Sequence, residues 1–127
     1  MNKKYIIKKK SEISNVIRSK ERSGNSYFVI YKKYNYENVN FKFALSIGKK
    51  YGNAVARNKI KRQLRSIVRE NKDKINRNIE FVIVIKPQAN QLQYNEINES
   101  ITDLLKKINI SFATSLIVCF YSSFGFM

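Results

Sequence analysis

The segment from Ile79 to Ile85 restricts the fold more than any other, because nearly all of its side chains are apolar. A strand that is covered on both faces typically has this composition. Pro87 follows the run and ends it, since proline cannot donate to a strand ladder. We therefore predict a buried strand from Ile79 to Ile85 in a sheet that packs against helices.

Two further strands are predicted upstream of this run. From Phe41 to Ile47, apolar and smaller or polar residues alternate, which is the period-two pattern of a strand with one buried face. Tyr27 to Lys33 is rich in aromatic and β-branched residues and follows a turn signal at Ser23-Gly24-Asn25. We expect a loop from Asn35 to Asn40, with room for one extra strand between Lys33 and Asn40.

Three segments show helical spacing. Lys10 to Lys20 carries apolar residues three and four positions apart, with Ser11 as a candidate N-cap. A second helix should begin after Asn53, a good N-cap residue, and run to about Asn71. A third is predicted from Glu96 to Ile108, where the apolar positions are Ile97, Ile101, Leu104, Leu105 and Ile108.

These elements predict an α+β protein with the order α-β-β-(β)-α-β-α. Phe41 to Ile85 contains strand, helix and strand, which would form a parallel pair joined by a crossover helix. We expect a two-layer α/β sandwich with a mixed sheet of about four strands and one open sheet face. A length of 127 residues suits a single core. We place one domain at residues 1–110 and a separate apolar extension at residues 111–127.

The charge of the chain indicates a polyanionic partner. Lys and Arg number 25 against nine acidic residues, for a net charge of +16. Two alternative explanations of this charge are that a basic surface keeps the protein soluble and that it binds anionic membranes. A lone Cys119 without any histidine excludes a Cys-His nucleophile and a Cys/His zinc site. The N-terminus lacks the apolar stretch of a secretory signal, so we expect a cytoplasmic protein.

The helix predicted after Asn53 separates charge from apolar residues. At 100° per residue, its apolar stripe contains Ile60, Leu64, Ile67 and Val68. The opposite arc contains Asn58, Lys61, Arg62, Arg65 and Arg69. Arg57 falls near the edge of the stripe and Lys59 on the other flank. A solvated helix face usually mixes charge signs, whereas this one has no carboxylate before Glu70, which favours phosphate binding.

The run from Lys49 to Arg62, KKYGNAVARNKIKR, followed by Leu64-Arg65, resembles the signature of the bacterial ribonuclease P protein subunit. The resemblance extends over about residues 6–108. It implies a fold with a left-handed β-α-β crossover and implies that the basic helix and preceding loop dock on a catalytic RNA. The family has Arg at the position of Lys59. The lysine keeps the positive charge but lacks the planar guanidinium group that can donate two parallel hydrogen bonds to one phosphate. The RNA-binding residues that we assign are Lys49, Lys50, Asn53, Arg57, Asn58, Lys59, Lys61, Arg62, Arg65 and Arg69.

The resemblance also implies a groove, between the first helix and the open sheet face, for the single-stranded 5′ leader of precursor tRNA. The matching positions in this chain are Ile13, Ile17, Phe28, Tyr31 and Ser46. Family members often carry aromatic residues at the two helix positions, and isoleucines cannot stack on bases in that way. Ordinary core packing is an equal alternative for Ile13 and Ile17.

The implied function is that of an RNA-dependent endoribonuclease subunit in tRNA 5′-end maturation. The RNA would perform hydrolysis with bound Mg²⁺, and the protein would supply no catalytic residue and no metal ligand. Glu96, Glu99 and Asp103 share one helix side, but we interpret them as a solvated face. The expected partners are ribonuclease P RNA, with one protein per RNA, and precursor tRNA, with no small-molecule substrate.

Two rival hypotheses belong to other classes. One is a ribosomal or other structural RNA-binding protein of related fold, against which the motif from Lys49 to Arg65 argues. The other is a membrane-surface protein, based on the charge and on the uncharged residues 111–127. These seventeen residues are marginal for spanning a bilayer, and we do not expect a membrane partner. An added strand or packed extension, or an altered reading frame, would also explain them.

Overall fold

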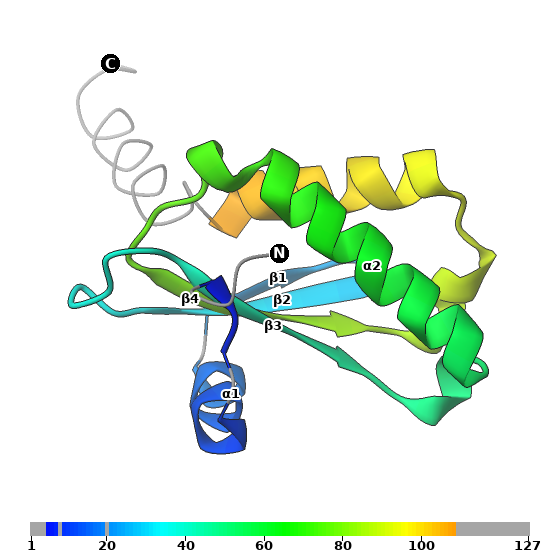
Figure 1. Ribbon diagram of the computed structural model, residues 1–127, viewed down its shortest axis with the longest axis horizontal. Coiled ribbons are helices and arrows are strands. Elements are labelled where there is room, and N and C mark those ends of the chain that lie inside the picture. The colour runs from blue at the N-terminus through cyan, green and yellow to red at the C-terminus, as the bar shows by residue number, and fades with distance from the viewer. Residues whose placement is uncertain (1–4, 8, 20, 109–127) are drawn as a thin grey trace, which may run out of the picture.

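The computed structural model describes residues 5–7, 9–19 and 21–108, and its centre is a four-stranded mixed sheet (Figure 1). The strands lie in the order β1-β2-β4-β3. β2 pairs antiparallel with both β1 and β4, whereas β3 and β4 are parallel. The α+β class and the predicted parallel pair are therefore confirmed. The strand bounds are β1 Arg22–Gly24, β2 Phe28–Tyr34, β3 Lys42–Ile47 and β4 Ile79–Ile85.

Helices cover the two faces of the sheet unequally. α2 (Ala54–Glu70) and a C-terminal helix of residues 94–108 lie over one face, and α1 (Lys10–Arg18) packs on the other (Figure 1). No helix in the described part of the chain is long and apolar enough to cross a bilayer. The apolar extension 111–127 lies outside the described residues.

β4 is buried from both sides, as its apolar sequence predicted. Five of its seven residues are buried. Toward α2, Phe81 stacks on Phe43 with ring centroids 5.6 Å apart. Toward α1, Val82 forms a second small cluster with Ile7, Val16 and Ala44. The aromatic stack and this cluster bury most of the strand, while Glu80 and Val84 remain half-buried.

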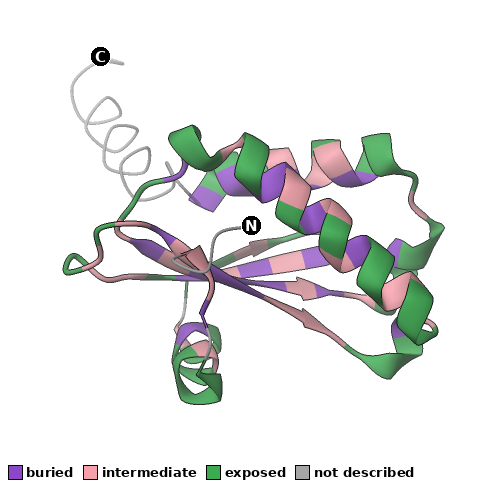
Figure 2. Cartoon of the chain, viewed as in Figure 1, coloured by how far each residue is buried: buried purple, intermediate pink, exposed green. Residues whose placement is uncertain are grey.

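The two large helices fill the main core with the residues that their spacing predicted. The buried residues of α2 are Ile60, Leu64, Ile67 and Val68, and those of the C-terminal helix include Ile97, Ile101, Leu104, Leu105 and Ile108. Figure 2 shows the buried stripe of α2 turned toward the sheet and its exposed residues turned away. The amphipathic pattern therefore fixes which face of α2 reaches solvent.

The fourth strand does not lie between Lys33 and Asn40, where we expected room for it. The fourth strand is β1, which pairs with β2 across a turn at Asn25. The Asn25 side-chain oxygen stabilises this turn by accepting hydrogen bonds from the backbone N–H groups of Tyr27 and Phe28. Gly24 permits this close pairing, since an added Cβ would lie 3.0 Å from the Phe28 carbonyl oxygen.

The segment from Asn35 to Asn40 is a compact loop, as predicted. Its form is fixed by the Asn35 and Asn38 side chains, which donate hydrogen bonds to Glu80 at 3.2 and 2.6 Å. The loop is therefore held against β4 without pairing as a strand.

α1 differs from its prediction at both ends. Ser11 is not the N-cap, because the helix already begins at Lys10 and Lys9 occupies the cap position without a side-chain hydrogen bond. The helix ends at Arg18, and the Ser19 hydroxyl donates a hydrogen bond to the Lys32 carbonyl instead of continuing the helix. Ser19 therefore fastens the end of α1 to the sheet.

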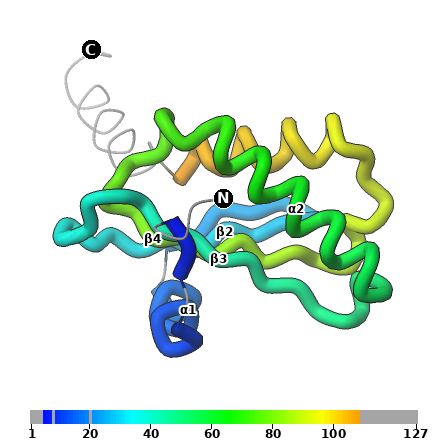
Figure 3. The backbone as a smooth tube through the Cα atoms, viewed as in Figure 1, coloured from blue at the N-terminus to red at the C-terminus, as the bar shows by residue number. Residues whose placement is uncertain are grey.

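The N-terminal segment lies along the outer edge of β3 before the chain turns into α1 (Figure 3). Ile6 forms an isolated parallel bridge with Phe43, and the Ile7 N–H donates to the Phe43 carbonyl at 2.9 Å. This short pairing protects part of a strand edge that would otherwise be open.

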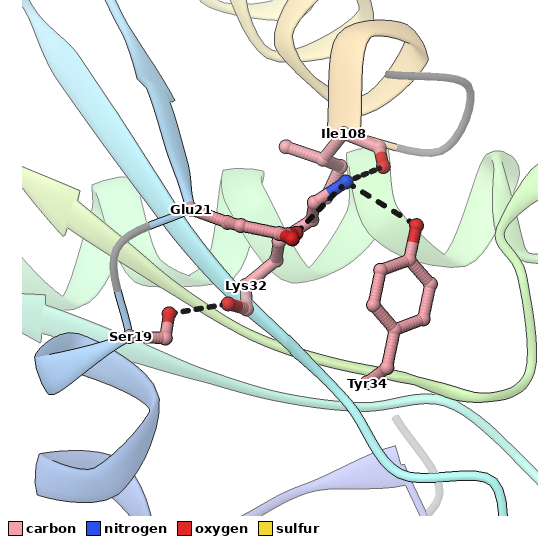
Figure 4. A network of polar contacts seen from close by, with 5 residues as sticks. All are labelled: Ser19, Glu21, Lys32, Tyr34 and Ile108. Atoms are coloured by element: carbon pink, nitrogen blue, oxygen red, sulfur yellow. Dashed lines mark hydrogen bonds and ion pairs between the residues drawn. The ribbon is translucent and has the colours of Figure 1, made fainter. Parts of the chain in front are cut away.

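Lys32 is a charged residue inside the main core, with only 3% of its surface exposed. Figure 4 shows its ammonium group meeting three partners from different elements. It donates to the Ile108 carbonyl at 2.7 Å and lies 3.4 Å from both a Glu21 carboxylate oxygen and the Tyr34 hydroxyl. Lysine near a helix C-terminus satisfies carbonyls and complements the helix dipole. Lys32 therefore joins the C-terminal helix to β2.

We predict that Lys32→Met destabilises the protein by about 1–3 kcal/mol, because the buried Ile108 carbonyl loses its charged donor. Lys33→Met is the matched control, since Lys33 is the exposed neighbour on the same strand. Urea unfolding followed by circular dichroism measures both free energies of unfolding. Equal stability of the two variants would show that the Lys32 contacts contribute nothing net.

Candidate nucleic-acid interface

The start of α2 is fixed by Asn53, which confirms its predicted role as N-cap. Its side-chain oxygen accepts a hydrogen bond from the Ala56 N–H at 2.9 Å. Its carbonyl also accepts from the Arg57 Nε at 3.4 Å, so the Arg57 side chain folds back over the helix start. Arg57 is half-buried in this position. The direction of Arg57, which the sequence left open, is thus set by the cap residue.

Lys49 and Lys50 lie on a short 3₁₀ turn, Lys49–Tyr51, immediately before α2. Tyr51 anchors the turn: it is 8% exposed, and its carbonyl accepts a hydrogen bond from the Asn90 side chain at 3.2 Å. Burial raises the pKa of the Tyr51 phenol above its ordinary value of 10.0. Both lysines remain exposed beside the helix start. The buried tyrosine therefore presents two cations on an ordered turn.

The exposed side of α2 carries the polar and basic residues that the 100° projection placed there. Asn58, Arg62, Arg65 and Arg69 are exposed, and Lys61 is half-buried. Lys59 is also exposed, on the flank. In the part of the chain that the structure describes, no carboxylate lies within ion-pair distance of these cations. We call Asn58, Lys61, Arg62, Arg65 and Arg69 the basic face.

A shallow hollow lies on the basic face, with a volume of about 320 Å³. Its lining residues are Arg62, Arg65, Ser66 and Arg69. Three guanidinium groups around a small hydroxyl residue can each offer paired N–H donors to one anionic oxygen group. This arrangement is chemically suited to the phosphates of a nucleic-acid backbone.

The α1 side of the sheet brings together most of the predicted groove residues. Tyr31 and Ala44 both pair with Val82, and Ser46 pairs with Val84 one row further along. α1 covers the first row, because Val16, Ile13 and Tyr31 share the small cluster around Val82. Ile13 is half-buried there, whereas Ile17 is 36% exposed at the rim of the helix.

Phe28 does not lie on this side of the sheet. It is 0% exposed in the main core under the two large helices, because side chains alternate between faces along β2. Val29 is the β2 residue on the groove side, in register with Val84. The alternation already required this, since Tyr31 and Phe28 are an odd number of residues apart. Arg22, which pairs with Tyr31, is a further residue of this side that sequence reasoning missed.

No described residues form a group of three His, Cys, Asp or Glu side chains placed to hold a metal ion. Glu96, Glu99 and Asp103 are exposed on the C-terminal helix. Glu96 has a local role, because its carboxylate accepts a hydrogen bond from the Gln93 N–H at 3.2 Å near the helix start.

The chain is similar to known proteins over most of its length. The sequence profile of the Ribonuclease P family matches residues 1–109. The ribonuclease P protein component of Phytoplasma australiense is 52% identical over 112 residues, which cover 87% of this chain and 96% of that protein. The component from Acholeplasma laidlawii is 49% identical over 110 residues, covering 87% of this chain and 94% of that protein.

A solved structure is similar as well. The RNase P protein of Staphylococcus aureus matches with a TM-score of 0.78 and 30% identity, covering 84% of this chain and 96% of that one. By sequence over most of its length and by fold, this chain belongs to the family of bacterial ribonuclease P protein components, the protein part of an RNA-based endoribonuclease.

Proposed function

We propose that the basic face of α2, with Lys49, Lys50 and the helix start, binds the RNA of ribonuclease P. We further propose that the α1 side of the sheet holds the 5′ leader of precursor tRNA. Family membership implies partnership with ribonuclease P RNA and a role in tRNA processing. The proposal assigns the two RNA contacts to two surfaces of this chain.

One observation carries the first assignment. The cations of α2 stand on a helix whose opposite face is fully buried, and no described carboxylate neutralises them. The cations of such a face repel one another in the free protein, and a bound polyanion relieves this repulsion. A structural RNA-binding protein of another kind would share this feature, and family membership favours ribonuclease P over that alternative.

The position of the two surfaces supports the second assignment. α2 and α1 lie on opposite faces of one sheet (Figure 1), so one RNA can bind α2 while another strand approaches α1. Tyr31 and Arg22 lie on the α1 side and offer a ring and a guanidinium to a single strand. Because the family supplies the protein part of an RNA-based endoribonuclease, we assign hydrolysis to the RNA and its bound Mg²⁺, assisted by one protein per RNA. The protein contributes charge and orientation.

Reconstitution tests the proposal directly. We expect the protein to restore cleavage of a precursor tRNA at the mature 5′ end by a bacterial ribonuclease P RNA at low Mg²⁺, where the RNA alone is slow. The protein should lower the Mg²⁺ concentration required, because its cations screen the RNA charges. Binding of that RNA without any stimulation of cleavage would contradict the proposal.

Arg62→Ala and Arg65→Ala should each weaken binding to the RNA and reduce the slope of log affinity against log salt by about 0.7–0.9, as for one lost phosphate contact. Filter binding at several salt concentrations measures the slope. Arg77→Ala is the matched control, because Arg77 is exposed in the turn before β4, away from α2. A slope that stays unchanged in both α2 variants would place the RNA elsewhere.

Ser46→Glu should weaken binding of precursor tRNA to the holoenzyme by about 1 kcal/mol, or roughly fivefold, relative to mature tRNA, because one added anion would face the leader phosphates. Ser66→Glu is the comparison, because it introduces the same carboxylate among the α2 arginines. It should weaken binding of the ribonuclease P RNA but leave unchanged the ratio of the affinities for precursor and mature tRNA. If Ser46→Glu left that ratio unaltered, the leader would not lie on the α1 side.

A further inference from the structure

A small pocket of about 180 Å³ lies at the outer edge of β3, between α1 and α2. Its walls include Ile6 of the N-terminal segment, Ile13 of α1, and Ala44 and Leu45 of β3. Lys61 and Arg65 of the basic face line it from the α2 side. We call this cavity the edge pocket. It lies where the two proposed RNA surfaces meet.

The edge pocket exists because the N-terminal segment protects only part of the β3 edge. Ile7 donates to the Phe43 carbonyl, and the chain then turns away, since Lys9 already caps α1. Residues two positions apart in a strand present their backbone groups to the same edge. The N–H and carbonyl of Leu45 therefore face outward beside the pocket, and within the described residues no hydrogen bond joins them to another segment at this edge.

The chemistry of the edge pocket matches one nucleotide. Aliphatic side chains and Phe43 form the walls, and Leu45 offers one backbone donor and one acceptor. Two cations lie at the α2 side without a carboxylate partner among the described residues. A base needs an apolar slot with hydrogen-bonding groups at its edge, and its phosphate needs cations. The volume is below the usual 300–1,000 Å³ of pockets for larger ligands, which favours a single ring system.

We infer that the edge pocket receives one unpaired base of the RNA that docks on α2, with the adjoining phosphate at Lys61 and Arg65. This inference rests on the proposed function, because it requires RNA on the basic face. It adds a contact of a different kind: α2 binds the backbone regardless of sequence, whereas Leu45 would read the edge of a base. A protein strand added to the β3 edge is the alternative occupant, and the positive charge beside it favours RNA.

The first test is an NMR titration of the whole isotope-labelled protein with adenosine and uridine 5′-monophosphates, and separately with inorganic phosphate. We expect saturable shifts of the Leu45 amide and of the Ile6 and Ile13 methyl groups with a nucleotide but not with phosphate. Phosphate should affect the basic side chains of α2, Lys61 and Arg65 among them, and leave the Leu45 amide and the two methyl groups unshifted. If both titrations shifted only α2 signals, or neither shifted Leu45, the inference would be overturned.

The second test fills the edge pocket without altering charge. Ile6→Trp should abolish the nucleotide shifts and weaken ribonuclease P RNA binding roughly fivefold or more, as expected for one lost base contact. The salt dependence should stay as in the unaltered protein, because no phosphate contact is lost. Val39→Trp is the control, since Val39 is 77% exposed in the loop between β2 and β3.

The two proposals fail in different ways. If Arg62→Ala flattens the salt dependence while Ile6→Trp leaves RNA affinity unaltered, RNA docks on α2 but no base enters the edge pocket. If neither variant changes RNA binding, the docking surface itself is elsewhere. An Ile6→Trp protein that failed to fold would leave the decision to the titration of the unaltered protein.

Discussion

The burial of β4 from both sides is the constraint on which the rest of the structure depends. A largely buried strand needs partners at both edges and packing on both faces. β2 and β3 supply the edges, α2 and the C-terminal helix cover one face, and the small cluster around Val82 covers the other. Once α2 is held by four buried aliphatic residues, its cations have only one direction to face. The outward direction of the basic face is therefore a consequence of the core.

The elements that pack on β4 were predictable because their signals are strong and local. The alternation in β3, the spacing in both large helices and the cap at Asn53 each follow from one stretch of sequence. β1 was missed, because three residues carry no periodicity and the strand exists only through the Asn25 turn. Lys32 was unpredictable for a related reason: its burial depends on Ile108, a residue far along the chain.

Some parts of the candidate site could be predicted from the sequence and others could not. The basic face follows from helix geometry alone, and the structure places its residues as projected. The groove residues were assigned from the family resemblance. Phe28 does not lie on the groove side, because side chains alternate between the two faces along β2 and Phe28 is an odd number of residues from Tyr31. The edge pocket could not be predicted from sequence, since it needs the N-terminal segment, α1, β3 and α2 together. The left-handed crossover that the family resemblance implies likewise cannot be derived from a pattern that is equally compatible with the common hand.

The hydrogen bond between Lys32 and Ile108 joins residues that are 76 positions apart. Closing so long a loop costs chain entropy before any contact compensates for it, so such a contact forms late on the folding route. Its loss should then act mainly on the rate of unfolding and leave the rate of folding nearly unchanged. On this argument we expect the buried lysine to slow unfolding, in addition to raising stability at equilibrium.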